Sequence, residues 1–329
     1  MKIGKILTTC IMVAAMGSAF AAKPISIKVG DNWNDTHPIA AAMDKVFKPM
    51  VEKGTNGAIK VDVYHSGTLG NEGDLWNGVR NGTIEIAIVG TPMNQEFPMM
   101  MISDWPFLYR DLDHAKKVWT GPIADEMNDA FQKKFPSVRM LAWGPNSART
   151  FTSNKKLTSV ADFKGQKFRM PPNPIHVGIA QNLGASAQVI PLGELFSAME
   201  TNVVDGQDNG MVTVVAQAFN EVQKYLYETN HIIATLEILA SATFLDKLPA
   251  EHQKVIKDAA KAAAVKAWDD YAASVDKDRQ YLKSKGMTVT PCSAEDQQKI
   301  IDMIKPLTDK LYKEQAWAKP LTDKIRAVK

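Results

Sequence analysis

Residues 166–186, QKFRMPPNPIHVGIAQNLGAS, run from a strand through a rigid turn into a helix. The run KFRM predicts a strand, which Pro171 and Pro172 interrupt. The segment after the third proline predicts a helix that ends at Gly184. A strand followed by a helix is the repeating unit of an α/β fold. Arg169 lies at the end of this strand with no acidic residue within several positions, so the local sequence leaves its charge uncompensated.

The same alternation of strands and helices precedes this segment. Residues 25–29 and 59–63 alternate apolar and polar side chains, and residues 83–89 form an apolar run, so each segment predicts a strand. Helices are predicted between them, one from Thr36 and one over residues 73–80. Short connections in the order β-α-β-α-β predict a mostly parallel sheet.

A second α/β stretch follows. Strands are predicted at residues 138–144, 167–170, 187–192, 231–235 and 238–244, and helices at residues 175–184, 193–200 and 212–219. Apolar residues at helical spacing then predict one long helix over about residues 250–285. A helix of about 30 residues is about 45 Å long. That is longer than one small domain needs, so we expect this helix to run across two domains.

A chain of 329 residues fits two α/β domains. No Gly/Ser-rich linker separates them, which predicts that the chain crosses between the domains more than once. We expect a signal peptide over residues 1–21. The first domain is expected to comprise residues 22–146 and 235–274, and the second residues 147–234 and 275–329.

The N-terminus has the parts of a secretory signal. Lys2 and Lys5 precede an apolar run that is too short to span a bilayer, and AFA at residues 19–21 matches the small-x-small cleavage pattern. We therefore expect cleavage after this motif and export of a soluble protein to the periplasm. Cys10 lies inside the signal. A lipoprotein would need this cysteine at the cleavage site, so its position argues against lipidation. Cys292 is then alone, so the mature chain can form no intramolecular disulfide.

Charge and motifs argue against several functions. The formal net charge is +3 and no block of Lys or Arg exceeds two residues, so nucleic acid is not an expected partner. The sequence has no dinucleotide fingerprint, P-loop, zinc-protease motif or nucleophile elbow. Its six histidines lack metal-ligand spacing, so we expect no catalysis, no metal and no cofactor. His176, which follows the proline-rich turn, is a candidate for a pocket.

Two arginines and one amide are better candidates for a binding site. Arg149 follows a strand end and a Gly-Pro turn, and Arg169 ends a strand, which are positions that line the cleft in open α/β sheets. A guanidinium can clamp a carboxylate or sulfonate with two hydrogen bonds. Asn209 lies in the polar segment VVDGQDNG, which favours a turn. The alternative is that the arginines pair with surface carboxylates and that Asn209 serves only the turn.

Seven segments together resemble one family. They are HSGTLGNE (65–72), GTIEIAI (82–88), SARTFTSNKKLTSVADFKG (147–165), DFKGQKFRMP (162–171), LGASAQVIPLGELFSAMETNVVDGQDN (183–209), FNEVQKYLYETNHI (219–232) and LPAEHQKVIKDAA (248–260). In this order they resemble the solute-binding proteins of tripartite ATP-independent periplasmic (TRAP) transporters, named for C4-dicarboxylate binding. The resemblance covers roughly residues 25–313. It implies two α/β domains around a cleft, a periplasmic-binding-protein-like fold, a long helix spanning both domains, and delivery of a small organic anion to the small and large membrane permease subunits.

The resemblance also implies roles for individual residues. Arg169 matches the arginine that clamps the carboxylate, Arg149 a second arginine that assists, and Asn209 an amide near the same group. Asn32 matches a position that faces the ligand from the other domain. Further pocket candidates are Glu72, Thr91, Trp33 and Met170. The chain departs at these last positions from the sialic-acid branch, and it carries Asp208 where many relatives have Glu.

The sequence therefore predicts a monomeric periplasmic binding protein rather than an enzyme. Its expected ligand is a dicarboxylate, hydroxy acid or sugar acid. A small alkyl sulfonate such as isethionate or taurine is the alternative, because two arginines and two amides could surround three sulfonate oxygens. Trp33 and Trp143 could instead enclose an aromatic acid. A periplasmic enzyme acting on a carboxylic acid, and a sensor that presents its closed form to a membrane kinase, remain open.

Overall fold

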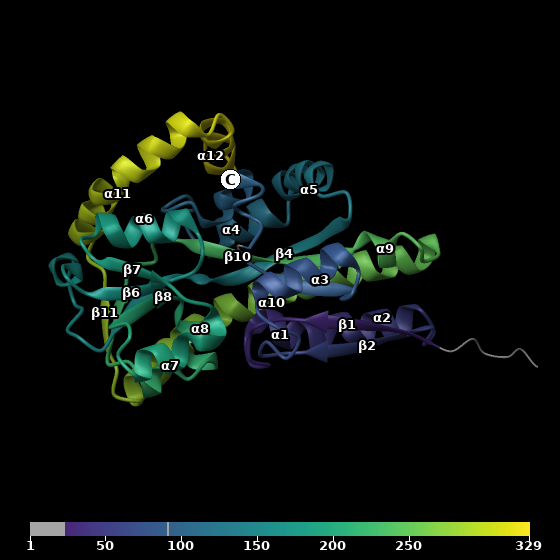
Figure 1. Cartoon of the computed structure of the whole chain (residues 1–329), viewed down its shortest axis with the longest axis horizontal. Helices are drawn as coiled ribbons and strands as arrows, with labels where there is room; N and C mark the ends of the chain where they lie inside the picture. Colours follow the sequence, from purple (N-terminus) through teal and green to yellow (C-terminus); the bar gives the residue numbers. More distant parts are fainter. Residues whose placement is uncertain (1–23, 91) are drawn as a thin grey trace, which may run out of the picture.

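The computed structural model describes residues 24–90 and 92–329 and contains two mixed β-sheets covered by helices (Figure 1). One sheet has five strands in the order β2-β1-β3-β10-β4, and the other has six in the order β11-β9-β5-β8-β6-β7. The predicted α/β class with two sheets is confirmed. The expected signal peptide, residues 1–21, lies outside the described residues.

The five-stranded sheet consists of β1 (Ile25–Gly30), β2 (Ile59–Tyr64), β3 (Ile86–Val89), β4 (Val138–Ala148) and β10 (Ile233–Ser241). β1 pairs in parallel with β2 and β3, as predicted from the β-α-β-α-β order. β10 lies between β3 and β4 and is antiparallel to both. A strand from late in the chain thus completes a sheet that begins at the N-terminus.

Helices cover this sheet. They are α1 (Pro38–Ala42), the π-helix η1 (Met43–Phe47), α2 (Lys48–Gly54), α3 (Glu72–Asn81), the 3-10 helix η2 (Pro98–Asp104), α4 (Leu112–Trp119), α5 (Pro122–Lys134) and α9 (Ala242–Leu245). The helix predicted from Thr36 is present as the continuous series α1, η1 and α2. The two strands predicted at residues 231–244 are wrong in detail, because β10 is one strand and α9 follows it. A continuous apolar run does not distinguish a buried strand from a buried helix.

The six-stranded sheet consists of β5 (Thr150–Ser153), β6 (Lys167–Met170), β7 (Ser186–Val189), β8 (Gly206–Asn209), β9 (Tyr225–Glu228) and β11 (Thr288–Pro291). Its associated helices are η3 (Val160–Phe163), α6 (Pro174–Asn182), η4 (Leu192–Glu194), α7 (Leu195–Glu200), α8 (Met211–Ala216) and η5 (Phe219–Glu221). The interpretation of GQDN as a turn is wrong. These four residues form β8, which is buried between β5 and β6 and pairs with both.

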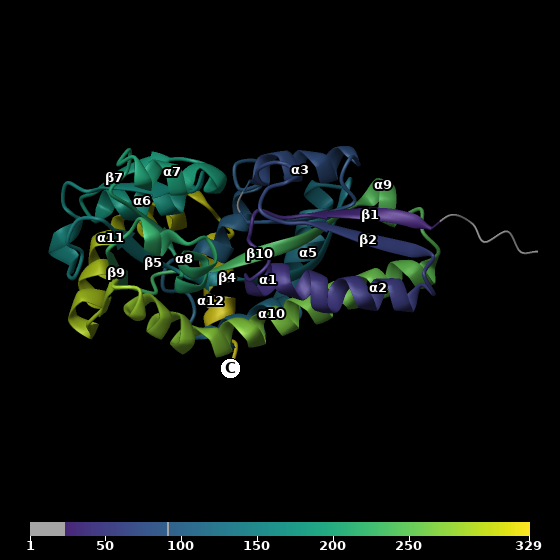
Figure 2. The ribbon, with the colours of Figure 1, turned by 90° about the horizontal axis from the view of Figure 1, so that it is seen from below.

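One helix connects the two halves. α10 (Ala250–Ser284) has 35 residues, and at 1.5 Å per residue it is about 50 Å long. It contacts β4, α1 and α2 at one half and α8 and β11 at the other, and it extends along most of the molecule in Figure 2. The predicted long helix that crosses both halves is confirmed. In the described residues, no helix combines the length and apolar character that a membrane crossing requires.

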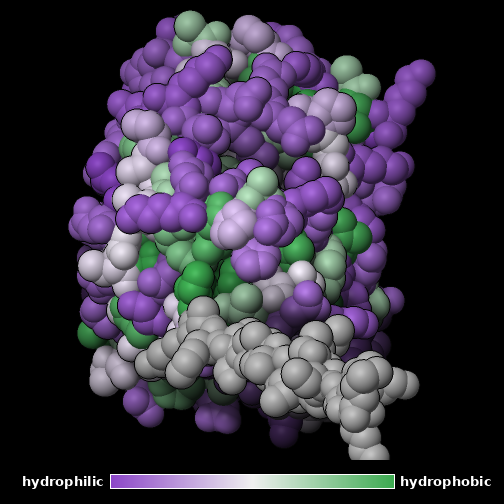
Figure 3. Space-filling model, turned by 90° about the vertical axis from the view of Figure 1, so that its right-hand side faces the viewer, coloured by the Kyte–Doolittle hydropathy of each residue, from purple (hydrophilic) through white to green (hydrophobic). Residues whose placement is uncertain are grey.

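The C-terminal helices return across the molecule. α11 (Ala294–Glu314) contacts α6, whereas α12 (Ala318–Arg326) contacts η2. His114 of α4 lies with its Nε2 3.0 Å from the carbonyl oxygen of Ile325 in α12. Since α6 contacts the six-stranded sheet and η2 the five-stranded one, the C-terminal helices form another connection between the halves. At the end of the molecule that carries α2 and α9, hydrophilic side chains dominate, with small hydrophobic areas between them (Figure 3).

Candidate functional site

A cleft of about 310 Å³ lies where the two halves meet. Its walls are formed by Asn32, Asn71, Glu72, Gly73, Pro92, Gln95, Arg169, Pro172, Val189, Pro191, Leu192 and Gly193. A narrower deep end of about 30 Å³ shares Glu72, Arg169 and Leu192 with it. The deep end is further lined by Trp33, Gly90, Asp104, Asn146, Arg149, Pro171, Asn209 and Thr235. Sequence segments more than 200 residues apart therefore contribute to one concave surface.

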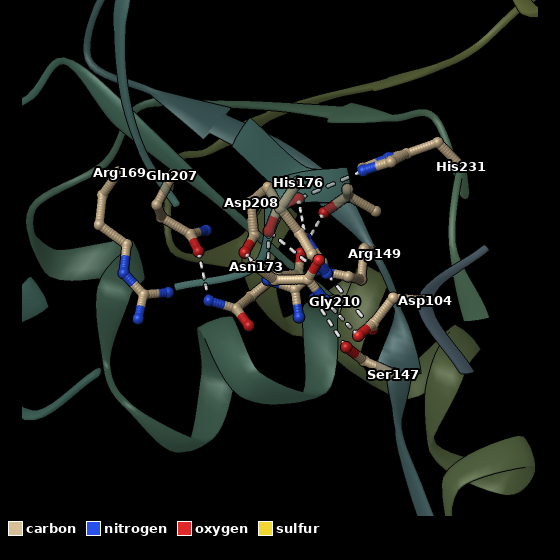
Figure 4. Close-up of polar contacts among 12 residues, drawn as sticks. Asp104, Ser147, Arg149, Arg169, Asn173, His176, Gln207, Asp208, Gly210 and His231 are labelled. Carbon is tan, nitrogen blue, oxygen red and sulfur yellow. Dashed lines mark hydrogen bonds and ion pairs between the residues drawn. The ribbon is translucent and has the colours of Figure 1, made fainter. Parts of the chain in front are cut away.

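Arg169 is the cation that faces this cleft. It lies on β6, is only 3% exposed, and donates from Nε to the carbonyl oxygen of Ile190 at 2.6 Å. Its two terminal nitrogens make no hydrogen bond to any described residue, and no dashed line reaches them in Figure 4. Among the described residues, no Asp or Glu oxygen lies within 4.0 Å of the guanidinium. Burial, together with the charge of Arg149, lowers the pKa of Arg169 to about 10, so it remains a cation at neutral pH.

Arg149 has a partner within the protein. Its Nε donates to Oδ1 of Asp208 at 2.8 Å, and its Nη2 donates to the same oxygen and to the Asp208 carbonyl. Burial alone would raise the pKa of Asp208, but the charge of Arg149 and the contacts of His176 and His231 hold it well below its usual value. Nη1 of Arg149 makes no hydrogen bond to a described residue, so one donor group remains for the deep end of the cleft.

The floor of the cleft offers amide groups. Asn209, the last residue of β8, donates from Nδ2 to Oε1 of Gln207 at 2.7 Å, and its Oδ1 has no hydrogen bond to a described residue. Asn146 of β4 also lines the deep end, and its buried Oδ1 lacks a partner among the described residues. Asn146 was missed at the sequence level. The Gly-Pro pair directly before it, which interrupts an apolar strand, is the signal that could have identified it.

The opposite wall carries Glu72, Asn32 and Trp33. Glu72 is the first residue of α3, and its Oε1 accepts a hydrogen bond of 2.6 Å from the Gly90 amide. Burial raises the pKa of Glu72, although this hydrogen bond and the charges of both arginines oppose the rise. Asn32 donates from Nδ2 to the Gly70 carbonyl at 3.0 Å, and its buried Oδ1 lacks a partner among the described residues.

Six of the eight candidate residues line the cleft, namely Arg169, Arg149, Asn209, Asn32, Glu72 and Trp33. Met170 does not, because it is fully buried in the hydrophobic core. Successive side chains of a strand point to opposite faces, so a cleft-facing Arg169 directs Met170 away from the cleft. Thr91 lies outside the described residues.

Two further expectations concern His176 and the tryptophans. His176 is completely buried behind the cleft and contacts Asp208 and Asp104. Trp143 stacks on Trp119 with ring centroids 4.3 Å apart and lines another cavity, of about 200 Å³, between α4, α5 and α10. Trp33 and Trp143 therefore do not enclose a common ligand, and that expectation is wrong.

The arrangement of donors in the cleft could accommodate an anion. Arg169 supplies a rigid, desolvated fork with unused donors, and neutral amides surround it. Arg149 is balanced by Asp208, so the cleft has one uncompensated cation. Within residues 24–90 and 92–329, no three His, Cys, Asp or Glu side chains gather in a way that could hold a metal ion.

Comparisons with known proteins place the chain in a family. Residues 29–315 match the model of the bacterial extracellular solute-binding proteins, family 7. An uncharacterised protein of Haemophilus influenzae is 34% identical over 327 residues, which are 99% of this chain and 98% of that protein.

Two solved structures are similar over almost the whole chain. A TRAP periplasmic solute-binding protein from Haemophilus influenzae with bound L-gulonate has a TM-score of 0.89 and 34% identity, covering 93% of this chain and 100% of that one. A sugar acid binding protein from Advenella mimigardefordensis in complex with galactonate has the same TM-score and 29% identity, covering 93% and 99%.

Proposed function

The chain belongs to the bacterial extracellular solute-binding proteins of family 7, and on that basis we propose that it captures a sugar acid in the cleft by means of Arg169 and delivers it to a TRAP membrane permease. The cleft lies between the two halves, so a ligand that contacts both would favour their closure. The closing units are the proposed domains, residues 22–146 with 235–274 and residues 147–234 with 275–329. The chain would act as a monomer in the periplasm after removal of residues 1–21, and it would bind its ligand without converting it.

The unpaired guanidinium of Arg169 carries this proposal. A buried cation without an internal partner is costly, and an organic anion that accepts two hydrogen bonds would compensate it. The two free nitrogens of Arg169, Nη1 of Arg149 and the amide of Asn209 together offer donors for one carboxylate.

The remaining walls favour hydroxyl groups over a second carboxylate. Glu72 faces the same cleft and can accept hydrogen bonds from hydroxyls, as can the free oxygens of Asn32 and Asn146. A second carboxylate near Glu72 would meet a like charge. The two neighbouring structures with bound gulonate and galactonate support a polyhydroxy monocarboxylate.

A ligand screen tests the proposal. Thermal shifts can be measured with aldonates, uronates, C4-dicarboxylates, isethionate and taurine, and the hits followed by calorimetry. We expect aldonates such as L-gulonate to be the strongest ligands. A stronger response to isethionate or taurine would favour the sulfonate alternative. Binding that survives Arg169→Ala unchanged would show that the anchor has been assigned to the wrong residue.

A further inference from the structure

A row of alternating charges connects two residues that line the deep end of the cleft, Asp104 and Arg149, through His176 and Asp208 (Figure 4). Nε2 of His176 lies 3.3 Å from Oδ1 of Asp104, and Nδ1 of His176 lies 3.1 Å from Oδ2 of Asp208. Asp208 in turn holds Arg149, which lines the cleft. All four side chains are at least nine-tenths buried, so each depends on its neighbours for compensation of its charge.

The two ends of this row belong to different halves of the molecule. Asp104 is the last residue of η2, which contacts β10 of the five-stranded sheet. His176 lies on α6, which contacts β6 and β7 of the six-stranded sheet. Asn173 strengthens the connection, because its Oδ1 accepts from the Ile175 amide at the start of α6 while its Nδ2 donates to Oδ2 of Asp104 at 2.7 Å.

The two neighbouring carboxylates favour the protonated form of His176. Each ring nitrogen faces a carboxylate oxygen, and a neutral imidazole has only one N–H group. Nδ1 is hydrogen-bonded to Asp208, whereas Nε2 has no hydrogen-bond partner among the described residues, so its contact with Asp104 is electrostatic and favours the cation. The groups that face it are these two carboxylates and Arg149, while His231 contacts the same Asp208 oxygen at 3.3 Å.

We propose that Asp104 and His176 are positioning residues for the anion site, which hold Asp208 and thereby aim Arg149 at the ligand. This inference rests on the proposed function of the cleft. Deprotonation of His176 would remove its attraction to one of the two carboxylates. Asp104 on η2 would then no longer help to fix the orientation of Asp208 and Arg149. The connection would also couple the position of η2 in one half to the anion site in the other.

The sign of the resulting pH dependence follows from the surroundings of His176. Burial lowers its pKa, but Asp208 and Asp104 outweigh burial and Arg149, so the net pKa is raised above the ordinary 6.5. The cationic form is therefore favoured at low pH and is lost as the pH rises through the raised pKa of the folded state. Over pH 6.5–8, His65, with a pKa of about 9, stays largely protonated, whereas burial lowers the pKa values of His114 and His231.

Calorimetry with L-gulonate at pH 6.5, 7.25 and 8 tests this inference on the wild type, His176→Gln and Asp104→Asn. We expect the affinity of the wild type to fall as the pH rises from 6.5 to 8. His176→Gln should bind about tenfold more weakly at pH 6.5, and its affinity should not depend on pH. Asp104→Asn should shift the decline to lower pH, because His176 loses an anionic partner. A His176→Gln variant that keeps the wild-type affinity and pH profile would overturn the inference.

A readout without ligand separates this inference from the proposed function. The NMR signal of the Arg149 Nε–H group should titrate with His176 in the ligand-free wild type and should move in both variants. An unchanged signal in either folded variant would refute the positioning role even if no sugar acid bound. Asp278→Asn is the matched control, because Asp278 is also a buried acid but, among the described residues, its side chain is hydrogen-bonded to Ser274 on α10 alone, so affinity and the Arg149 signal should stay unchanged.

Discussion

Arg169 and Glu72 face the same cleft from opposite halves of the molecule without forming an ion pair. Their charges influence each other, since Arg169 opposes the rise in the pKa of Glu72 and Glu72 opposes the fall in the pKa of Arg169. The space between them is therefore bounded by a donor fork on one side and an acceptor on the other. The proposed ligand, a monocarboxylate with hydroxyl groups, would complement both sides.

Replacement of Arg169 by alanine should nearly abolish ligand binding. Loss of one partner of a buried charged contact typically costs about 2–5 kcal/mol, which is a loss of affinity of about 30-fold or more. The affinity of Arg169→Lys should lie between those of the wild type and Arg169→Ala, because an ammonium keeps the charge but not the planar fork. Calorimetry with L-gulonate measures both effects. Arg139→Ala is the control, because Arg139 pairs with the exposed Asp246 away from the cleft. This variant should bind L-gulonate with the affinity of the wild type.

Replacement of Glu72 by glutamine should change the ligand preference. The amide side chain of the Glu72→Gln variant can still accept from the Gly90 amide, but it no longer repels a second carboxylate. We expect succinate or malate to gain about tenfold in affinity and L-gulonate to lose a few-fold, since hydrogen bonds to a charged acceptor are the stronger ones. Competition titrations at pH 7.5 measure the ratio. A parallel change in both affinities would contradict a selective role of Glu72.

His65 should make the stability of the protein depend on alkaline pH. Its Nδ1 lies 2.7 Å from Oδ2 of Asp31 and its Nε2 3.0 Å from Oδ2 of Asp44, and the contact with Asp31 raises its pKa to about 9. A raised folded-state pKa adds stability that is complete below pH 6.5 and is lost as the pH rises through 9. Burial acts against the ion pair, because it opposes the rise in the pKa of His65 and it raises the pKa of Asp31.

Because His65 and Asp44 are partly exposed, we expect this contribution to be about 1–2 kcal/mol. Urea unfolding of the wild type and of His65→Gln at pH 6.5, 8 and 9.5 measures it. The variant should be less stable at pH 6.5, and the difference should vanish at pH 9.5. A difference that stays constant over this range would assign the effect to packing rather than to charge.

The elements that could be predicted from the sequence are those with a strong local pattern. The alternating strands β1 and β2, the apolar β3 and the helical spacing of α10 each determine their own structure because they bury one face or stripe. The strand-end position of Arg169 likewise placed it at the cleft. Met170 could have been excluded by the same reasoning, because it follows Arg169 in the strand and points to the other face.

The elements that could not be predicted depend on partners far away in the sequence. β8 is buried although its side chains are polar, because Asp208 is compensated by Arg149 and Gln207 donates to Thr152. Composition indicates a turn for such a segment and carries no information on these partners. The antiparallel position of β10 between β3 and β4 could not be predicted for the same reason, since pairing between strands far apart in the sequence leaves no local pattern.

Gly206 provides a test of how tightly β8 is held. It pairs with Ser153 of β5 on one side and Phe168 of β6 on the other, and a Cβ atom there would overlap the Thr152 carbonyl oxygen and lie 2.9 Å from the Phe168 ring. Because the first of these neighbours is backbone, the sheet would have to separate. We expect Gly206→Ala to lose about 3 kcal/mol or more of unfolding free energy.

Urea unfolding measures the loss in Gly206→Ala, and Gly193→Ala is the matched control, because a Cβ atom at Gly193 would meet open space. The control should keep the wild-type stability within about 0.5 kcal/mol, the usual range for a surface substitution. A strand that could shift to admit the methyl group would leave Gly206→Ala as stable as its control. In that case Asp208 and Asn209, on the same short strand, would not be fixed by the sheet either, and the precise aim of Arg149 would have to come from the side chains behind it.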